Sequence, residues 1–206
     1  MAMRKRLNRI CFITPDREDA EKVEEMVSVA LEAGIRWVQY RRKGGTRRQL
    51  YYEAEKLRDL TGRCGALFIV NDFADIALAV EADGVHIGQD DLPLREARKI
   101  MGEKIIGVST HNLKEALAAQ KGGADYIGFG PIFHTMTKDA GKPKGPGPIV
   151  EIKRYIDIPV IAIGGITPLN AAQVFSTGCD GVAASSGICS GDITANVSDF
   201  LYNVSI

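Results

Sequence analysis

The sequence has little that could form a disulfide framework or a zinc site. Its 206 residues include four cysteines, Cys11, Cys64, Cys179 and Cys189, which are far apart and form no C-x-x-C motif. The three histidines are also scattered. A zinc site needs ligands paired at short spacing, so this pattern argues against one. We interpret the cysteines as free thiols and expect a cytoplasmic protein.

Long apolar runs and an excess of charge of one sign are also absent. No stretch approaches the roughly 18 apolar residues of a membrane-spanning helix, and the basic residues Arg4, Lys5 and Arg6 are not followed by the apolar core of a signal peptide. We expect no membrane partner, and we interpret residues 1–8 as a basic, loosely ordered N-terminus. Lys and Arg number 26, as do Asp and Glu, so no overall field favours binding to nucleic acid.

Short apolar runs alternate with segments of helical periodicity along the chain. The predicted strands cover residues 10–14, 37–41, 66–70, 84–87, 105–108, 125–129, 159–163 and 180–184. The predicted helices cover residues 18–31, 46–60, 75–80, 93–101, 112–120, 149–155, 168–176 and 192–202. Near-continuous apolar strands are expected when both faces of a parallel sheet are covered. The sequence therefore predicts one α/β domain over residues 1–206, a (β/α)8 TIM barrel, with a doubly wound open sheet as the alternative.

Polar residues gather where the predicted strands end. Gln39, Arg41 and Lys43 alternate along the second strand and share one face, and the cost of a free charge in an apolar strand indicates an anionic partner. Other polar residues at strand ends are Asn71, Asp72, Gln89, Asp91, Ser109, Thr110, Thr135, Thr137 and Lys138. The opposite strand ends look bland. This asymmetry indicates an enzyme, because the active sites of such barrels lie at the carboxyl ends of the strands.

Two of these residues, Asp72 and Asp91, follow strands that are joined by a helical crossover. Strands joined in this way are parallel, so both carboxylates fall on the same edge of the sheet. Asp72 alone could equally cap a helix. As a pair, the two carboxylates supply the hard oxygen ligands that suit Mg²⁺, and they predict a metal site.

Small residues follow the last two predicted strands. Gly164 and Gly165 come after the seventh strand and Ser185 and Ser186 after the eighth, the usual place of a barrel phosphate site built from backbone amides. A second anion site far from the basic strand ends suggests two phosphorylated substrates, or one with phosphates at both ends. No Glu or Asp remains at a strand end as an obvious proton-abstracting base, which favours transfer chemistry driven by loss of a leaving group.

Several motifs, spread over nearly the whole chain, together resemble the thiamine-phosphate synthase family. They are Val38-Gln-Tyr-Arg-Arg-Lys43, Val70-Asn-Asp72, Gly84-Val-His-Ile-Gly-Gln-Asp-Asp91, Gly107-Val-Ser-Thr110, Asp125-Tyr-Ile-Gly-Phe-Gly-Pro-Ile-Phe133, Thr135-Met-Thr-Lys138 and Ile163-Gly-Gly-Ile166. The resemblance implies a Mg²⁺-dependent transferase of thiamine biosynthesis. Such an enzyme joins hydroxymethylpyrimidine diphosphate to hydroxyethylthiazole phosphate and releases diphosphate. Members of the family often self-associate, so the resemblance also allows a homo-oligomer.

Carried over residue by residue, the resemblance gives each position a role. Asp72 and Asp91 would hold Mg²⁺. The pyrimidine diphosphate would be bound by Gln39, Arg41, Lys43, Asn71 and Lys138, and Ser109 would contact the pyrimidine or its diphosphate. The thiazole phosphate side would be lined by Thr135, Thr137, Gly165, Ser186 and Ile188. Of these, we assign Arg41, Lys43, Lys138 and Ser109 to catalysis. The family mechanism is dissociative, and the thiazole nitrogen captures a pyrimidine-methyl cation.

The chain departs from the family pattern in three places. Arg42 stands where an acidic residue is usual, and by alternation we expect it to point away from the site. His134 replaces a common proline, and Ser185-Ser186-Gly187 is an unusual form of the eighth strand end. His86 lies within a strand and is interpreted as a core histidine with satisfied hydrogen bonds, and Trp37 as a packing residue.

Three other functions are compatible with a barrel of this kind. A thiazole tautomerase of the same fold would use a histidine just after the sixth strand, where this chain has Pro131. A sugar-phosphate epimerase would need a base at a strand end. A non-catalytic regulator would have no need to keep the acidic pair and the cations.

Overall fold

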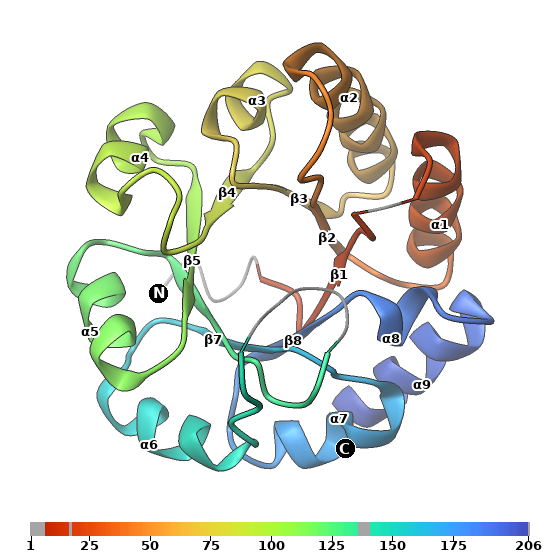
Figure 1. Cartoon of the computed structure of the whole chain (residues 1–206). Coiled ribbons are helices and arrows are strands. Elements are labelled where there is room, and N and C mark those ends of the chain that lie inside the picture. Colours follow the sequence, from red (N-terminus) through yellow and green to blue (C-terminus); the bar gives the residue numbers. More distant parts are fainter. Residues whose placement is uncertain (1–6, 17, 136–140, 206) are drawn as a thin grey trace.

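The computed structural model of the chain describes residues 7–16, 18–135 and 141–205. Parallel strands form a closed barrel in which each strand pairs with its sequence neighbours and β8 pairs with β1 (Figure 1). The strands are β1 (Ile10–Ile13), β2 (Trp37–Tyr40), β3 (Leu67–Asn71), β4 (Gly84–Ile87), β5 (Ile105–Thr110), β6 (Tyr126–Phe129), β7 (Val160–Ile163) and β8 (Gly181–Ala184). The predicted (β/α)8 TIM barrel is confirmed, and the open sheet is excluded.

The helices surround the barrel, and the described residues contain one more of them than the sequence predicted. They are α1 (Ala20–Glu32), α2 (Arg47–Arg63), α3 (Ala74–Ala79), α4 (Leu94–Met101), α5 (Leu113–Lys121), α6 (Gly147–Tyr155), α7 (Pro168–Phe175), α8 (Ser186–Cys189) and α9 (Ile193–Ser205). Thr46 caps α2 as expected, in a capping box with Gln49. The additional helix is α8, which is too short to show a helical period in the sequence.

Side chains of the strands alternate between the barrel interior and the layer beneath the helices. The interior is filled by a cluster of buried residues: Cys11, Ile13, Trp37, Ile69, Ile105, Tyr126, Ile161 and Ala183. Trp37 is 1% exposed and packs edge-on against Tyr126, with ring centroids 5.2 Å apart, as its predicted packing role requires. A larger cluster, to which Phe12, Phe68 and Phe129 belong, packs between strands and helices. This burial of apolar surface is the main favourable contribution to folding.

Three aspartates, which we call the aspartate clamps, join neighbouring strands at the end of the barrel where the strands begin. Asp83, Asp125 and Asp180 directly precede β4, β6 and β8. Each carboxylate accepts a hydrogen bond from a main-chain N–H at the start of the preceding strand and pairs with a basic residue of a helix. Asp83 lies 2.8 Å from the Phe68 N–H nitrogen and 3.1 Å from Arg58. Asp125 lies 2.7 Å from the Ile106 nitrogen and 2.7 Å from Arg98. Asp180 lies 2.8 Å from the Val160 nitrogen and 2.6 Å from Lys153. The expectation that this end is bland is therefore wrong at these positions.

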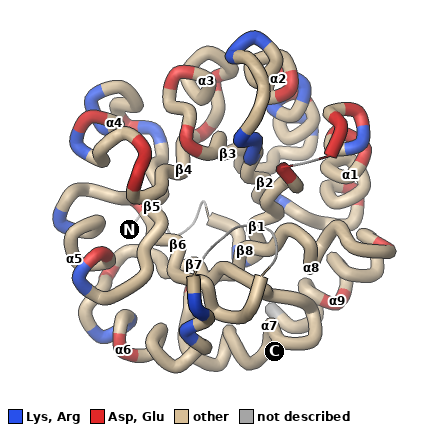
Figure 2. The backbone as a smooth tube through the Cα atoms, viewed as in Figure 1, with Lys and Arg blue, Asp and Glu red and all other residues tan. Residues whose placement is uncertain are grey.

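Charges of both signs are spread over the outer helices, and no side of the ring carries a single sign (Figure 2). This distribution agrees with the net charge of zero. All four cysteines are free thiols. In the part of the chain that the structure describes, no helix is long and apolar enough to cross a membrane.

Candidate active site

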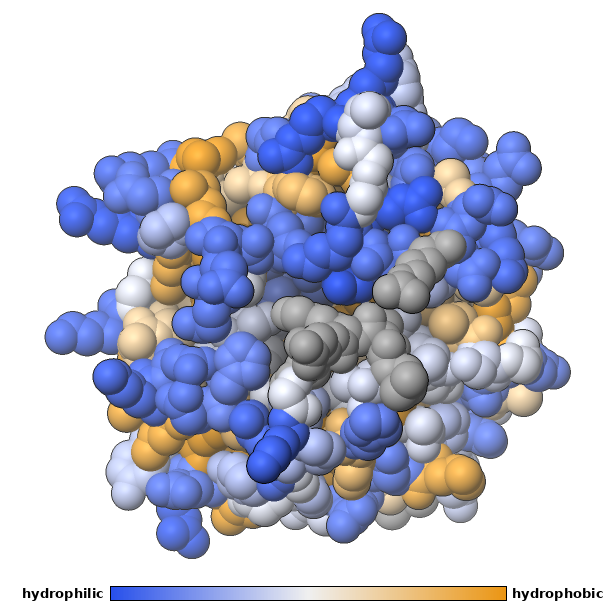
Figure 3. All heavy atoms as spheres, in the orientation of Figure 1, coloured by the Kyte–Doolittle hydropathy of each residue, from blue (hydrophilic) through white to orange (hydrophobic). Residues whose placement is uncertain are grey.

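A cavity of about 310 Å³ opens where the strands end, at the face opposite the aspartate clamps. Hydrophilic residues surround the centre of this face (Figure 3). The cavity is lined by Ile13, Arg41, Gly88, Gln89, Asp90, Ser109, Thr110, His111, Gly128, Gly130, Pro131, Thr135, Ile163, Gly164, Gly165, Ile166, Ala183, Ala184, Ser185 and Ser186. Residues from distant parts of the sequence thus converge on one opening, as expected for a site built from the loops of a barrel.

A chain of polar contacts runs along the ends of β2 and β3. Gln39 is 4% exposed, and its amide nitrogen donates to Asn71 Oδ1 at 2.7 Å. The Asn71 amide in turn donates to Asp72 Oδ1 at 2.5 Å. Lys43 Nζ lies 2.9 Å from the other carboxylate oxygen, Asp72 Oδ2. Four predicted site residues therefore form one connected network beside the cavity.

Asp72 and Asp91 meet at this end of the barrel. Asp72 follows β3 with a φ of 67°, a left-handed conformation that Asp tolerates better than most residues. Asp91 Oδ2 accepts a hydrogen bond from the Gly88 N–H at 2.7 Å. Burial, together with a hydrogen bond between the two carboxyl groups, raises the pKa of Asp91 above its ordinary value. Two carboxylates in contact form an oxygen donor set that fits a hard divalent cation.

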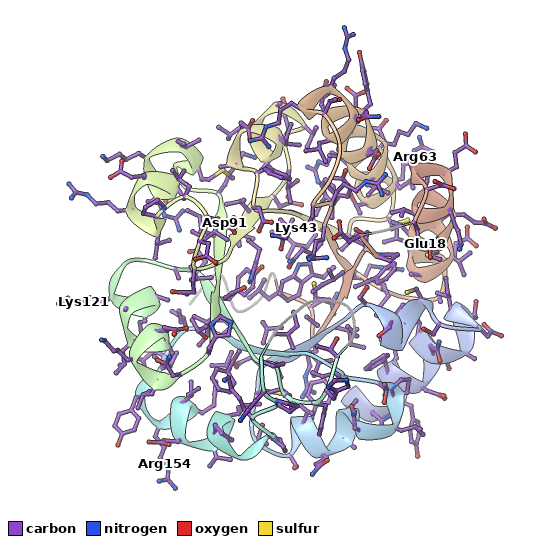
Figure 4. All side chains as sticks on the ribbon, viewed as in Figure 1. Glu18, Lys43, Arg63, Asp91, Lys121 and Arg154 are labelled. Atoms are coloured by element: carbon purple, nitrogen blue, oxygen red, sulfur yellow. The ribbon has the colours of Figure 1, made fainter. Side chains whose placement is uncertain are left out.

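Asp72 and Asp91 are a pair only, since in the part of the chain that the structure describes no group of three or more His, Cys, Asp or Glu could hold a metal ion. Figure 4 places Asp91 and Lys43 toward the inside of the ring, whereas Arg63, Lys121 and Arg154 lie on the outer helices. Oxygen atoms of substrate and water could supply the remaining ligands of a cation bound by the pair.

Arg41 lines the cavity and is held by the segment that follows β1. Its main-chain N–H donates to Thr14 Oγ1 at 2.9 Å, and its Nη1 lies 3.3 Å from Asp16 Oδ2. The Arg41 side chain is 11% exposed, and Nη1 has no hydrogen-bond partner. Asp16 also accepts from the Lys43 N–H at 2.5 Å. An incompletely paired, nearly buried guanidinium favours an anion in the cavity.

Arg42 points away from the cavity, as its position between Arg41 and Lys43 predicted. Its Nη1 donates to the main-chain oxygens of Asp16 and Glu18 at 3.2 and 2.6 Å. Its Nη2 pairs with Glu53 Oε1 at 3.1 Å. The other carboxylate oxygen of Glu53 accepts from the Tyr40 hydroxyl at 2.7 Å. Arg42 therefore ties the segment after β1 to α2 from behind the site.

Ser109 is positioned by two neighbours on the floor of the cavity. Its hydroxyl lies 2.9 Å from His86 Nε2, and its main-chain oxygen accepts from the Gln89 amide at 2.5 Å. The other ring nitrogen of His86 lies 3.0 Å from the Tyr126 hydroxyl. His86 is 5% exposed and has both ring nitrogens in hydrogen bonds, in line with the interpretation of a satisfied core histidine.

The loops after β7 and β8 form the other end of the cavity. Gly165 has a φ of 64°, and a Cβ atom there would lie 2.3 Å from the His134 carbonyl oxygen, so only glycine fits. Ser185 Oγ is buried and has no hydrogen-bond partner, and Ser186 begins α8. A small-residue loop beside a short extra helix is the kind of place where barrels bind a phosphate.

The remaining predicted residues are placed differently. Thr135 lines the cavity. Ile188 does not, because its side chain is fully buried and its N–H is bonded to the Ser185 oxygen. Thr137 and Lys138 lie outside the described residues.

Sequence reasoning assigned no role to Asp16 or to His111. The place of Asp16 just after the first strand was the available signal, but its contacts with Arg41 and Lys43 depend on the closed barrel. His111 lines the cavity, and its Nδ1 lies 2.9 Å from Glu115 Oε2. Burial acts to raise the pKa of Glu115, but hydrogen bonds from His111 and Asn112 outweigh it and hold that pKa below its ordinary value.

Comparison with known proteins identifies relatives over most of the chain. The family model described as thiamine monophosphate synthase matches residues 10–188. A thiamine-phosphate synthase of Chloroflexus aurantiacus is 51% identical over 168 residues, which cover 81% of this chain and 78% of that protein. One of Clostridium novyi is 41% identical over 202 residues, covering 96% and 99%. The structure of a thiamine phosphate pyrophosphorylase from Pyrococcus furiosus superposes with a TM-score of 0.88 at 36% identity, covering 100% of this chain and 98% of that one. The chain belongs to the thiamine monophosphate synthase family.

Proposed function

We propose that the chain transfers the hydroxymethylpyrimidine group from its diphosphate to hydroxyethylthiazole phosphate, with release of diphosphate and in the presence of Mg²⁺. The observation that carries this proposal is that a cluster of charged side chains and a loop of small residues flank the same cavity. Arg41 and Gly88 line one side of the cavity, and Asp91, which accepts from the Gly88 N–H, lies behind this lining with Asp72 and Lys43. Gly164, Gly165, Ser185 and Ser186 line the other side.

At the first end, Arg41, Lys43, Gln39 and Asn71 would bind and orient the diphosphate. Asp72 and Asp91 would hold Mg²⁺, whose chemistry is to neutralise negative charge on phosphate oxygens. Positive groups fixed in advance around a leaving group stabilise the charge that develops on it. Lys138, carried over from the family motif, would act with them.

At the second end, the backbone around Gly165 and Ser186 would bind the thiazole phosphate together with Thr135, and the family motif assigns the same role to Thr137. The bond between the pyrimidine methylene carbon and the diphosphate oxygen breaks, and both electrons leave with the oxygen. The lone pair of the thiazole nitrogen then forms the new carbon–nitrogen bond. This nitrogen carries no proton, so the reaction needs no general base.

The lining of the cavity supports transfer over the alternatives. A sugar-phosphate epimerase would need a base at a strand end, whereas the carboxylate residue that lines the cavity, Asp90, is exposed at the rim. Pro131 occupies the position where a thiazole tautomerase would carry its histidine, and proline has no group that could move a proton. We also infer a cytoplasmic location from the free thiols and the biosynthetic family, and self-association stays a prediction.

The direct test is formation of thiamine phosphate from the two purified substrates, with Mg²⁺ and with a chelator in parallel. We expect product only with Mg²⁺. A tautomerase assay on the same sample serves as the comparison. Product in neither transferase arm, from protein shown to be folded by circular dichroism, would overturn the proposed function.

A further inference from the structure

A chain of hydrogen bonds leads from the barrel interior to the cavity. Tyr126 on β6, His86 on β4 and Ser109 on β5 contribute one side chain each. The Tyr126 hydroxyl lies 3.0 Å from His86 Nδ1, and His86 Nε2 lies 2.9 Å from Ser109 Oγ. Tyr126 is 1% exposed, so its hydroxyl has no access to bulk water. Ser109 is the member of the chain that lines the cavity.

Two glycines leave the space that this chain occupies. In the strand register Gly107 stands between His86 and Tyr126, and Gly128 stands beside Ser109. A Cβ atom on Gly107 would lie 2.4 Å from the Tyr126 hydroxyl and 2.5 Å from His86 Nδ1. A Cβ atom on Gly128 would lie 3.1 Å from the His86 ring. The backbone of two strands is therefore fitted to these two rings.

The direction of the hydrogen bonds follows from the hydroxyl of Tyr126. Burial raises the pKa of this hydroxyl, so it keeps its proton. Within the described residues, the acceptor in reach of that proton is His86 Nδ1. A buried hydroxyl that donated to nothing would cost the full penalty of an unmade hydrogen bond. Tyr126 therefore donates to Nδ1, and the neutral imidazole carries its own proton on Nε2.

This tautomer decides what Ser109 can offer to a ligand. Because Nε2–H donates to Ser109 Oγ, the serine hydroxyl proton is not used within the chain and can point into the cavity. With the opposite tautomer, Ser109 would donate to His86 and present only lone pairs. We propose that Tyr126 is a positioning residue which, through His86, makes Ser109 a hydrogen-bond donor to the pyrimidine substrate. This inference rests on the proposed function for the identity of that substrate.

The acceptor on the substrate is either a pyrimidine ring nitrogen or a diphosphate oxygen, since both accept a hydrogen bond from a hydroxyl. Two probes separate these sources. One is hydroxymethylpyrimidine without its diphosphate, and the other is inorganic diphosphate with Mg²⁺. The probe whose affinity falls when the hydrogen bonds from Tyr126 through His86 to Ser109 are interrupted carries the acceptor.

The first experiment measures the tautomer in the unmodified protein by ¹⁵N NMR of labelled imidazole groups. With three histidines in the sequence, His111→Gln and His134→Gln assign the remaining signal to His86. We expect a protonated Nε2 and an unprotonated Nδ1. A proton on Nδ1, whether alone or with one on Nε2, would overturn the proposal. This measurement needs no substrate, so it stands even if the protein forms no thiamine phosphate and the proposed function fails.

The second experiment is a double-mutant cycle of Tyr126→Phe and Ser109→Ala, read out as affinity for the two probes. We expect Tyr126→Phe to weaken one probe about fivefold, as for loss of one neutral hydrogen bond. It should cause no further loss in the Ser109→Ala background. Equal losses in both backgrounds would show that Tyr126 acts only on the structure, and would overturn the proposal.

Trp37→Phe is the matched control, because Trp37 packs edge-on against Tyr126 and its Nε1 makes no hydrogen bond. It changes packing around the tyrosine ring and leaves the hydrogen-bond chain intact, so probe affinity should not change. A loss equal to that of Tyr126→Phe would assign the effect to packing and overturn the role of the hydroxyl.

Discussion

Lys43 Nζ forms an ion pair with Asp72 Oδ2 at a distance of 2.9 Å, so a cation proposed to bind diphosphate contacts a carboxylate proposed to bind metal. The Lys43 side chain is 49% exposed and that of Asp72 is 9% exposed. The lysine can therefore leave this pair at little cost, while the aspartate stays in place. When Mg²⁺ binds at Asp72 and diphosphate binds at Lys43, the ion pair between these two residues would be replaced by one contact to the metal and one to the diphosphate.

Lys43→Gln is expected to weaken binding of the pyrimidine diphosphate selectively. Hydrogen bonds to charged groups contribute about 1.5–3 kcal/mol, so KM for this substrate should rise roughly tenfold or more. KM for thiazole phosphate should stay within about twofold, because its proposed site lies at the other end of the cavity. Steady-state kinetics with each substrate varied in turn measures both. Equal rises in the two constants would contradict the assignment.

Asp91→Asn is expected to abolish Mg²⁺-dependent turnover while keeping the fold, since the amide oxygen can still accept from the Gly88 N–H. Asp90→Asn is the control, because Asp90 is the adjacent carboxylate and is exposed at the rim. Activity across a Mg²⁺ titration and binding of Mn²⁺ measured by calorimetry test the pair. Wild-type metal affinity in Asp91→Asn would rule out a metal-binding role for this residue.

Arg42→Glu, which restores the charge usual in the family, is expected to destabilise this chain. The new carboxylate would face Glu53, and the carbonyl oxygens of Asp16 and Glu18 would lose their donor. Loss of these contacts should lower the free energy of unfolding by about 1–3 kcal/mol. The free energy of unfolding of Arg42→Lys should lie between those of the wild type and Arg42→Glu, because an ammonium group cannot make the paired hydrogen bonds of a planar guanidinium. Denaturant unfolding gives both values, and a stable Arg42→Glu protein would contradict this account.

Asp125→Asn tests the aspartate clamps. Asparagine can still accept one hydrogen bond but loses the ion pair with Arg98, so we expect a loss of about 1–3 kcal/mol in stability. Both KM values should be unchanged, because the clamp and the cavity lie at opposite ends of the barrel. The exposed Asp199→Asn provides the control for loss of one negative charge. A shift in KM without a shift in thermal midpoint would be the opposite of this expectation.

Glu115 gives a prediction about pH. Its pKa is lower in the folded than in the unfolded state, where Glu titrates at about 4.3. The unfolded state therefore binds the proton more readily, and stability from this group is present above that value and lost as pH falls below it. Glu115→Gln should lower the thermal midpoint at pH 7, with the difference shrinking as the pH falls through about 4. A difference that grows on acidification would show the wrong sign.

Much of the fold could be predicted because strands buried on both faces appear as apolar runs. Strand β4 (Gly84–Ile87) matches its predicted range, whereas β5 continues to Thr110 because polar residues can remain in a ladder whose inner face lines a cavity. Helix α8 (Ser186–Cys189) was missed because a single turn is too short to show helical periodicity in the sequence, and so short a helix depends on tertiary contacts for its stability. Asp72 and Asp91 could be brought together from topology alone, since parallel strands place their ends on one edge.

Contacts between side chains of distant strands could not be predicted in the same way. Tyr126 looked like an ordinary strand residue, and its contact with His86 depends on the register of three strands and on the glycine between them. Asp16 needed the closure of β1 against β2 to reach Arg41 and Lys43. Alternation predicted the direction of Arg42, but not the partners that it found.

The aspartate clamps fasten three pairs of neighbouring strands in the closed barrel. Each clamp precedes an even-numbered strand and reaches back to the odd-numbered strand before it, so β3–β4, β5–β6 and β7–β8 each carry their own fastening. These fastenings lie at the end of the barrel away from the cavity. Residues of the loops around the cavity can therefore be substituted while the aspartate clamps at the opposite end keep the strands in place. Changes in the loops of the rim would therefore leave these three contacts between strands intact.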